Sequence, residues 1–355
     1  MMLRVEKLRE QMKKDQLDGF LVTSPYNLRY LTNFTGTTGL AVITLDKAFF
    51  VTDFRYTEQA AAQAQGFEIV KNVGPIFDEV AKLCQQEEIN ALAFEESHVS
   101  FAEYSVLEEI IEETPLVPVS GMIENLREVK DDAEIAIIEK ACAIADQGYE
   151  HVLKMIKPGM TEIEVANQLD FFMRSLGATS VSFDTIVASG LRSAMPHGVA
   201  SDKVIEQGDL ITLDFGCYYE GYVSDMTRTF AIGDPGSQLK EIYQIVLEAQ
   251  LKVLAAAKPG LTGIQLDAVA RDHIAAAGYG EAFGHSTGHG IGLEIHEGPN
   301  VSFRADKQFV VGNVITDEPG IYLPGIGGVR IEDDLLITPE GNRVLTSAPK
   351  ELIIL

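Results

Sequence analysis

Carboxylate side chains recur at matched distances around two expected turns of the chain, a pattern that can bind cations. Asp214 and Asp225 are 11 residues apart in two β-rich runs, with the turn-like sequence YYEGY between them. If the chain reverses between Tyr219 and Glu220, the two aspartates are direct cross-strand neighbours, with Cβ atoms about 4.5 to 5.5 Å apart. Two buried carboxylates so close repel strongly unless they are protonated or neutralised by cations. The spacing therefore predicts a cation site.

A second pair of carboxylates follows the same arithmetic. Glu318 and Glu332 are symmetric about Gly325 in the glycine-rich sequence LPGIGG, so a hairpin there brings them face to face. Four inward carboxylates bring about four negative charges into one place, which a single divalent ion would leave undercompensated. The two hairpins together predict a site for two divalent ions.

The densest group of histidines lies in GHSTGHGIGLEIHEGP, residues 284–299, which contains His285, His289 and His296. Each glycine inside a helix costs about 1 kcal/mol, so these glycines argue against a helical metal-binding pair. In a regular strand His289 and His296 would face opposite sides. All three histidines converge only if a bulge or turn at the glycines redirects one of them. A functional site and a glycine-rich bend with incidental histidines both stay open on spacing alone.

One more histidine, His197, follows Pro196 in FDTIVASGLRSAMPHG, where a strand-like run ends in a Ser-Gly turn. A single loop histidine is more often a surface residue than a functional one. It becomes a candidate site residue only together with the other histidines.

Composition restricts the class of protein. The 355 residues exceed what one hydrophobic core usually supports, so two domains are expected. With 53 Asp and Glu against 28 Lys and Arg, the net charge of −25 excludes nucleic acid as an expected partner. The chain has no run of about 18 apolar residues, and its charged N-terminus lacks the apolar core of a signal peptide, so we expect no membrane partner and a cytoplasmic location. Three widely separated cysteines are expected to be buried free thiols.

The first third of the chain alternates helical stretches, beginning with an amphipathic one through Leu3, Leu8 and Met12, with short apolar runs, which is typical of an α/β domain. These β-rich runs lie at 19–23, 39–45, 48–53 and 91–95. A charged stretch then leads into a long helical pattern with Asp131 or Asp132 as its N-cap. The predicted domains are residues 1–127 and 128–355.

The second domain contains an internal repeat. KPGMTEIEVANQLDFFMRSLGA from Lys157 matches KPGLTGIQLDAVARDHIAAAGY from Lys258, at an offset of 101 residues. Thr161 and Thr262 occupy N-cap positions after a Pro-Gly helix stop. Because one copy alone would expose its apolar faces, we expect two pseudo-symmetric halves that close over one sheet, with a site in the cleft between them.

Taken in order, SGLRSAMPHG, LDFGCYYEGYVSDMTRTF, GHSTGHGIGLEIHE and DEPGIYLPGIGGVRIED resemble the pita-bread metallopeptidases, within them the prolidase and aminopeptidase P group. NLRYLTNFTG and VTDFRYTEQA resemble the small domain that precedes the catalytic domain in this group. The resemblance implies an α/β (α+β) fold, with a smaller N-terminal creatinase-like α/β domain and a pita-bread catalytic domain. It also implies a dinuclear-metal exopeptidase that hydrolyses the Xaa-Pro bond of dipeptides or peptide N-termini.

The resemblance further assigns roles to individual residues. The implied metal ligands are Asp214, Asp225, His289, Glu318 and Glu332. Of these, Asp225 and Glu332 would bridge the two ions, and Glu318 would take a proton from the attacking water. The residues implied to line the substrate pocket are His197, His285 and His296, and Arg330 would hold a ligating aspartate. Asp317 departs from the apolar residue of many relatives, and on a strand it would face away from Glu318.

An oxygen-rich donor set with one imidazole favours manganese over a thiolate-loving metal, and cobalt, zinc or iron also fit. The resemblance implies a short proline-containing peptide as substrate and a homodimer as the assembly. Three alternatives are a methionine-aminopeptidase-like exopeptidase, a metal-free creatinase-like hydrolase and a non-enzymatic peptide-binding module. The N-terminal domain argues against the first, and the complete ligand set argues against the other two. The preference between dipeptides and longer peptides is left open by the sequence.

Overall fold

Each part of the chain packs around apolar cores of its own. The structure, a computed structural model, describes residues 2–355. Contacts divide the chain into two units between Arg127 and Glu128, and the buried apolar clusters among the described residues each lie within a single unit. Every helix within residues 2–355 is too short or too polar to cross a membrane. The three cysteines, Cys84, Cys142 and Cys217, are buried and unpaired, as predicted.

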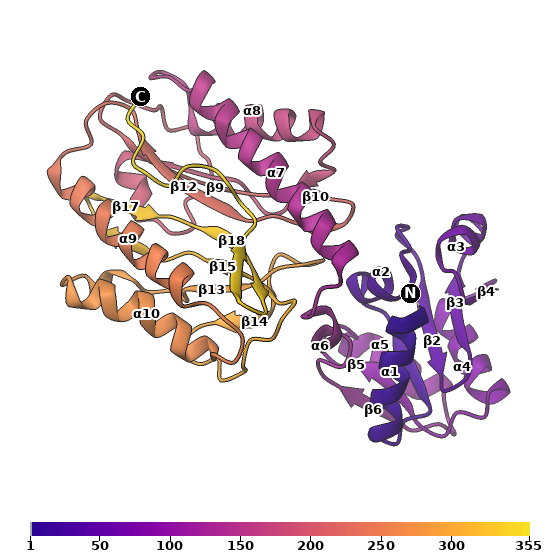
Figure 1. The fold of residues 1–355 in the computed structure, drawn as a ribbon. Coiled ribbons are helices and arrows are strands. Elements are labelled where there is room, and N and C mark those ends of the chain that lie inside the picture. The colour runs from indigo at the N-terminus through magenta and orange to yellow at the C-terminus, as the bar shows by residue number, and fades with distance from the viewer. Residues whose placement is uncertain (1) are drawn as a thin grey trace. The chain divides into compact units, whose positions relative to one another are not determined.

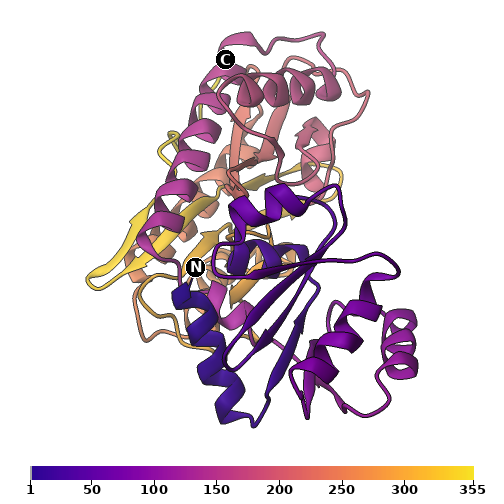
Figure 2. The same cartoon turned by 90° about the vertical axis from the view of Figure 1, so that its right-hand side faces the viewer.

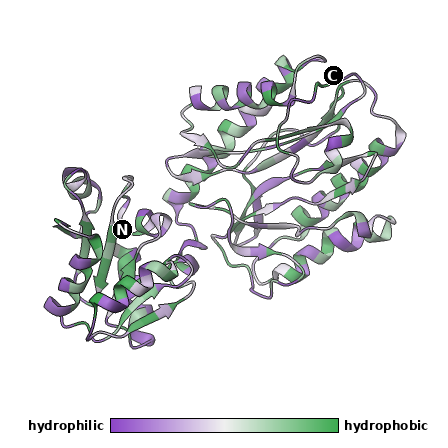
Figure 3. Ribbon diagram, turned by 180° about the vertical axis from the view of Figure 1, so that it is seen from behind, coloured by the Kyte–Doolittle hydropathy of each residue, from purple (hydrophilic) through white to green (hydrophobic). Residues whose placement is uncertain are grey.

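Within residues 2–127, apolar and β-branched runs form one mixed six-stranded sheet in the order β4-β3-β2-β1-β5-β6. The four predicted runs form β1, β2, β3 and β5, and all four strands are buried. Figures 1 and 2 show these strands side by side, and Figure 3 shows how hydrophobic they are. The strands are β1 (Gly19–Val22), β2 (Leu40–Thr44), β3 (Ala48–Thr52), β4 (Glu68–Lys71), β5 (Leu92–Glu95) and β6 (Leu116–Val119). The helices are α1 (Met2–Lys14), α2 (Pro25–Thr32), α3 (Thr57–Gln63), α4 (Ile76–Gln86), α5 (Phe101–Ile110) and α6 (Glu124–Arg127).

The first helix corrects one detail of the predicted amphipathic pattern. Its buried stripe consists of Val5, Leu8 and Met12, whereas Leu3 is 69% exposed. At about 100° per residue, Leu3 lies roughly 140° around the helix from Leu8, which places it outside the stripe.

The second unit begins with α7 (Asp132–Met155), whose N-cap is Asp131 in a capping box with Glu134. This confirms the predicted start of the long helix, because the Asp131 carboxylate accepts the Glu134 N–H in the first turn. Figure 1 shows α7 and α8 on one side of the strands of this unit and α9 and α10 on the other. The remaining helices are α8 (Glu162–Ser175), η1 (Gly190–Ala194), α9 (Ser237–Ala256), α10 (Gly263–Ala276) and η2 (Gly280–Ala282).

The expectation of one sheet shared by the two halves is wrong, because the strands of residues 128–355 form several small sheets. Among them are β12-β9-β8 in the first half and β14-β13-β15-β18-β19 in the second. Each half has its own apolar core. The strands of the first half are β7 (Ser180–Val181), β8 (Ile186–Ser189), β9 (Leu210–Phe215), β10 (Cys217–Tyr219), β11 (Tyr222–Val223) and β12 (Met226–Ala231). Those of the second half are β13 (Gly288–Gly290), β14 (Glu297–Val301), β15 (Val314–Asp317), β16 (Gly320–Leu323), β17 (Gly327–Arg330), β18 (Asp333–Thr338) and β19 (Gly341–Val344).

The predicted repeat has matching structure in the two halves. Thr161 and Thr262 each cap a helix through a capping box, as expected, and each also forms an isolated bridge, to Val204 and Gln308 respectively. The match continues beyond the repeat seen in the sequence. Gly208 and Gly312 both have φ of 94°, and six residues after them stand Asp214 and Glu318. The two carboxylates therefore occupy equivalent places in the two halves.

Candidate metal centre

The first hairpin brings Asp214 and Asp225 together, although in a different register from the prediction. Asp214 on β9 pairs with Thr227 on β12, and the turn residues are Glu220 and Gly221. Both have positive φ, 47° and 89°, which matches the right-handed twist of a two-residue hairpin turn. The chain thus reverses one residue later than predicted. Direct opposition of the two aspartates is wrong, and Asp225 lies two residues along from the partner of Asp214.

The second hairpin has the predicted symmetry about Gly325. Asp317 pairs with Asp333, and Gly320 pairs with Arg330. The β15–β18 ladder and the β16–β17 ladder follow the same register, although the residues between them are not paired. This register places Glu318 opposite Glu332. The Thr227 hydroxyl of the first hairpin donates to Glu332 Oε2 at 2.6 Å, so the two hairpins meet at their carboxylates.

A bulge and a turn decide which histidine faces the carboxylates. The register between β13 and β14 shifts between Gly288 and Gly290, at His289, and the chain turns before β14. This confirms the irregular backbone that convergence of the histidines requires. The rings of His289 and His296 approach to 4.4 Å between centroids, instead of pointing to opposite faces as they would on a regular strand.

The His289 ring directs one nitrogen towards the carboxylates and the other towards a backbone carbonyl. Its Nδ1 lies 3.1 Å from the Gly290 carbonyl, and its Nε2 lies 3.5 Å from Asp225 Oδ2 and 3.4 Å from Glu318 Oε1. Donation from Nδ1 to the carbonyl leaves the Nε2 lone pair directed at the carboxylates. Burial, together with the neighbouring His296, lowers the pKa of His289 to about 4, which keeps the ring neutral and able to bind a cation.

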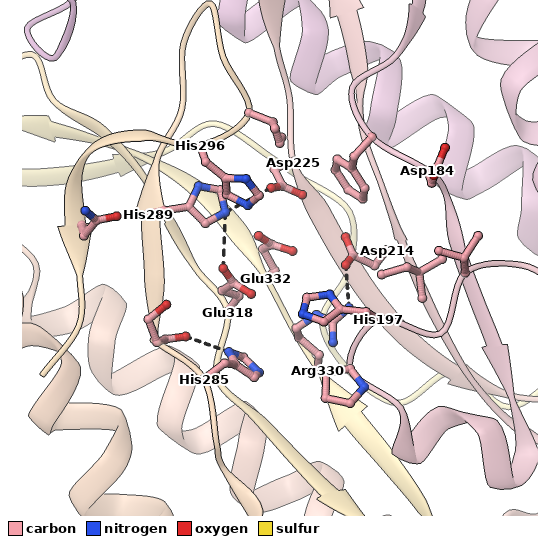
Figure 4. A pocket seen from close by; sticks show the side chains of 17 residues that line it. Asp184, His197, Asp214, Asp225, His285, His289, His296, Glu318, Arg330 and Glu332 are labelled. Carbon is pink, nitrogen blue, oxygen red and sulfur yellow. Dashed lines mark hydrogen bonds and ion pairs between the residues drawn. The ribbon is translucent and has the colours of Figure 1, made fainter. Parts of the chain in front are cut away.

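All nine predicted site residues line one cavity of about 540 Å³ within the second unit. Figure 4 shows the carboxylates in its centre, with His289 and His296 on one side and His197 and Arg330 on another. Asp225, His289 and Glu332 each offer a ligand atom within 4.8 Å of the others. Asp317, as expected, is absent from the cavity wall. It is fully buried with no hydrogen-bond partner for its carboxylate among the described residues.

The carboxyl groups resist ionisation together. Burial, then the charges of Glu332 and Asp214, raise the pKa of Asp225 well above its usual range. Burial, then Glu318 and Asp214, do the same to the pKa of Glu332. Burial raises the pKa of Glu318 to about 8, against the opposing effect of Arg330. Such a group is stable in its charged form only with added positive charge.

The donors present fit divalent cations. Asp214 Oδ2 accepts from Arg330 at 2.5 Å, while Asp214 Oδ1 is buried and without a partner among the described residues. A buried carboxylate oxygen normally has a hydrogen-bond donor or a cation. Four carboxylates and one imidazole form a hard donor set, suited to first-row divalent metal ions.

Several residues of the centre have no signal in the sequence. Tyr322 accepts a hydrogen bond from Arg330 Nη1 at 2.6 Å and lies 2.8 Å from His285 Nε2. Thr316 donates to Glu318 and accepts from the His289 backbone N–H. Only the meeting of separate segments gives these ordinary residues a role, so spacing along the chain could not reveal them.

Comparison with known proteins agrees with this geometry. The sequence pattern of the creatinase/prolidase N-terminal domain matches residues 4–129, and that of metallopeptidase family M24 matches residues 136–339. The chain is 43% identical to the Xaa-Pro dipeptidase of Pyrococcus horikoshii, over 99% of this chain and 98% of that one. An Xaa-Pro dipeptidase from Bacillus anthracis superposes with a TM-score of 0.98 at 56% identity, covering 100% of this chain and 99% of the other. An X-Pro aminopeptidase from Thermotoga maritima superposes with a TM-score of 0.91 at 42% identity, covering 96% and 98%.

These matches extend over both units and include the segments that carry the clustered carboxylates. They agree with the predicted α/β fold of a creatinase-like domain followed by a pita-bread domain. The chain belongs to metallopeptidase family M24.

Proposed function

We propose that this chain is a dinuclear-metal exopeptidase that hydrolyses the bond between a first residue and a following proline. One observation supports it above the others: four carboxylates and a neutral imidazole converge in a cavity that three further histidines line. The similar proteins include both Xaa-Pro dipeptidases and an X-Pro aminopeptidase. The cavity volume suits a short peptide.

In this proposal the residues that would hold two divalent ions are Asp214, Asp225, His289, Glu318 and Glu332. Divalent ions in such a site activate a water molecule for attack and polarise the scissile carbonyl. The donor set favours manganese. The roles of the remaining residues follow from their own contacts.

Glu318 is the proposed proton acceptor. Its Oε1 accepts from the Thr316 hydroxyl at 3.3 Å, and its backbone N–H donates to Thr287 O at 2.8 Å, so both ends of the residue are held. A carboxylate held within reach of the attacking water can accept its proton as a general base. Glu318 can then return this proton to the departing proline nitrogen.

The proposed hydrogen-bond partners of the substrate are the three cavity histidines other than His289, namely His197, His285 and His296. Burial, reinforced by Arg330, lowers the pKa of His285 to about 4, so its ring is neutral. Donors aimed at a developing oxyanion contribute about 3 to 4 kcal/mol each in well-studied enzymes. Arg330 orients Asp214 and is not proposed to contact the substrate.

The proposal has a structural part as well. We take residues 1–127 as the creatinase-like domain and 128–355 as the catalytic domain, supported by the division of contacts and the two pattern matches. A homodimer and a cytoplasmic location stay predictions from the sequence.

Hydrolysis of Ala-Pro, Ala-Pro-Ala and Met-Ala by the purified chain tests the proposal. With manganese added, Ala-Pro or Ala-Pro-Ala should be cleaved, Met-Ala should not, and a chelator should abolish cleavage. The ratio of the first two rates separates a dipeptidase from an aminopeptidase. Preferential cleavage of Met-Ala would favour a methionine-aminopeptidase-like enzyme, and activity that persists in chelator would contradict the metal mechanism.

A further inference from the structure

We propose that Glu162 and Asp267 are positioning residues that hold the two loops carrying His197 and His285. One of them stands in each half of the second unit, and neither lines the cavity. The inference rests on the proposed function, because it concerns two of the histidines proposed to contact the substrate.

In the first half, one buried carboxylate closes the loop that carries His197. Glu162, on α8, is 0% exposed. It accepts from Ser189 N and Oγ, both at 2.8 Å, on one side of His197, and from Ser201 N at 3.1 Å and Oγ at 2.6 Å on the other. Arg192 also donates to Glu162, and its second nitrogen donates to Val199 O at 3.0 Å. The loop is thus tied to one side chain before and after the histidine.

In the second half, Asp267 on α10 makes the same kinds of contact near His285. It is 1% exposed and accepts from Thr287 N at 3.1 Å and Thr287 Oγ1 at 2.8 Å. Arg271 donates to both carboxylate oxygens, at 2.7 and 2.8 Å. The same guanidinium donates to the Phe283 and His285 carbonyls at 3.1 and 2.8 Å.

The two carboxylates are not copies of each other in the repeat. At the offset of 101 residues, Glu162 corresponds to Gly263, and Asp267 corresponds to Ala166. Glu162 therefore lies four residues before Ala166, and Asp267 lies four residues after Gly263. Four residues are about one helical turn, so the two carboxylates project from the same helix face one turn apart. A side chain does not fit at Gly263, because its Cβ would lie 2.2 Å from Asn300 O and 2.6 Å from Ala305 Cβ.

Both halves nevertheless use the same set of donors. Each carboxylate binds the backbone N–H and hydroxyl of a serine or threonine, together with an arginine that also binds a loop carbonyl. Hydrogen bonds to an ionised group are shorter and stronger than neutral ones, so this set restrains a loop efficiently. Histidines that hydrogen-bond a substrate need such restraint, because displacements of about 0.5 Å weaken catalysis. The two halves form this set of hydrogen bonds from different helix positions. The shared feature is therefore the restraint of the histidine loops and not the position of the carboxylate in the repeat.

Isosteric substitutions in the full-length, manganese-loaded protein test the inference. Glu162→Gln and Asp267→Asn should each lower kcat/KM for Ala-Pro about tenfold, with bound metal unchanged. Matched controls on the same helices are Asp170→Asn on α8, whose partner is Arg174, and Asp272→Asn on α10, which is exposed. The controls should stay within about twofold of the wild type.

Double mutants distinguish positioning from general damage. In a His197→Ala background, Glu162→Gln should have less than about a twofold further effect, whereas Asp267→Asn should keep its full effect. A His285→Ala background should give the reverse. Equal losses in all backgrounds would overturn the proposal. If Glu162→Gln fails to fold, Ser201→Ala removes one hydroxyl donor and enters the same cycle.

Histidine side-chain NMR spectra of the metal-free variants give a result independent of hydrolysis. Glu162→Gln should shift the His197 ring resonances and leave those of His285 in place, and Asp267→Asn should do the opposite. If the wild type fails to cleave proline peptides but the spectra behave in this way, the proposed function fails and the positioning role stands. Unchanged ring resonances in both variants would overturn the positioning role.

Discussion

The carboxyl groups proposed to bind metal are expected to lower the stability of the metal-free protein. Asp225 and Glu332 are 4% and 2% exposed, and burial, followed by the charges of the neighbouring acids, raises the pKa of each. Like charges held close in a buried site cost free energy of folding. Cations remove this cost, so stability and metal affinity are expected to respond in opposite directions when one carboxylate is neutralised.

Asp225→Asn should make the metal-free protein more stable, by on the order of 1 kcal/mol, because it removes one charge and keeps the side-chain shape. The same variant should lose the stabilisation that manganese gives to the wild type, and its hydrolytic activity. Urea unfolding with and without a chelator measures both effects. Glu340→Gln, at an exposed position, serves as the control. If Asp225→Asn makes the protein less stable than wild type in chelator, yet leaves it stabilised by manganese, the charge argument is contradicted.

Stability of the metal-free protein should fall as pH rises from 6.5 to 8.5. The pKa of Glu318 is about 8 in the folded chain and about 4.5 when unfolded, so the folded state binds the proton more tightly. The stability that this proton gives is fully present below pH 4.5 and is lost as pH rises through 8. His285 and His289, with pKa values lowered to about 4, reduce stability only below about pH 6.5. The expected loss from Glu318 alone in this window is on the order of 1 to 2 kcal/mol, and Asp334, whose pKa burial also raises to about 8, adds to it. Urea unfolding in chelator at half-unit pH steps measures it, and a flat or rising profile would refute it.

At the scale of the elements, Arg330 on β17 connects the hairpins. Its guanidinium donates to Asp214 on β9 at 2.5 Å, to Thr227 on β12 at 3.1 Å and to Tyr322 on β16 at 2.6 Å. Arg330 is 3% exposed, so it is a buried cation that fixes the register between separate strands. Arginine suits this task because its planar group can bind three partners at once.

Arg330→Ala should lower the free energy of unfolding by about 3 to 5 kcal/mol, because it leaves the Asp214 carboxylate buried without its partner. Tyr322→Phe, which removes one hydroxyl between Arg330 and His285, should cost only about 1 to 2 kcal/mol. Urea unfolding of both variants in the metal-free state makes the comparison. Equal losses would show that the charge pair contributes no more than a neutral hydrogen bond.

The hairpins also show how far local sequence determines an element. The position of Gly325 in LPGIGG predicted the second hairpin in its correct register, since a glycine-rich turn between two β-rich runs permits few alternatives. The first hairpin was misplaced by one residue, because Glu220 adopts a positive φ that its residue type does not announce. A shift of one residue in the turn moves each cross-strand partner by two residues. The partner of Asp214 is therefore Thr227 and not Asp225.

At the scale of the whole molecule, all the proposed metal ligands belong to the second unit. The N-terminal unit has a separate apolar core that includes Leu21, Val42 and Phe94. Ligand binding stabilises the structure that binds it by about 2.7 kcal/mol when the ligand is at 100 times its Kd. Stabilisation by the metal should therefore be confined to residues 128–355.

Hydrogen exchange with and without manganese checks this expectation. Chelation should reduce protection in β9, β12, β13, β15 and β18, while β1, β2 and β5 should exchange at unchanged rates. Loss of protection in both units on chelation would show that they unfold as one cooperative body.

The sequence by itself determined the features that depend on neighbours along the chain. These are the β-rich runs of the first domain, the capped helices after Lys157 and Lys258, and the second hairpin with its symmetry about Gly325, because turn chemistry and periodicity act over a few residues. Only the tertiary structure decided what depends on distant segments: which ring nitrogen of His289 faces the acids, how Tyr322 joins Arg330 to His285, and where each half places the carboxylate behind its histidine loop. Such choices depend on the space and charge that the other half leaves, and no local pattern encodes them.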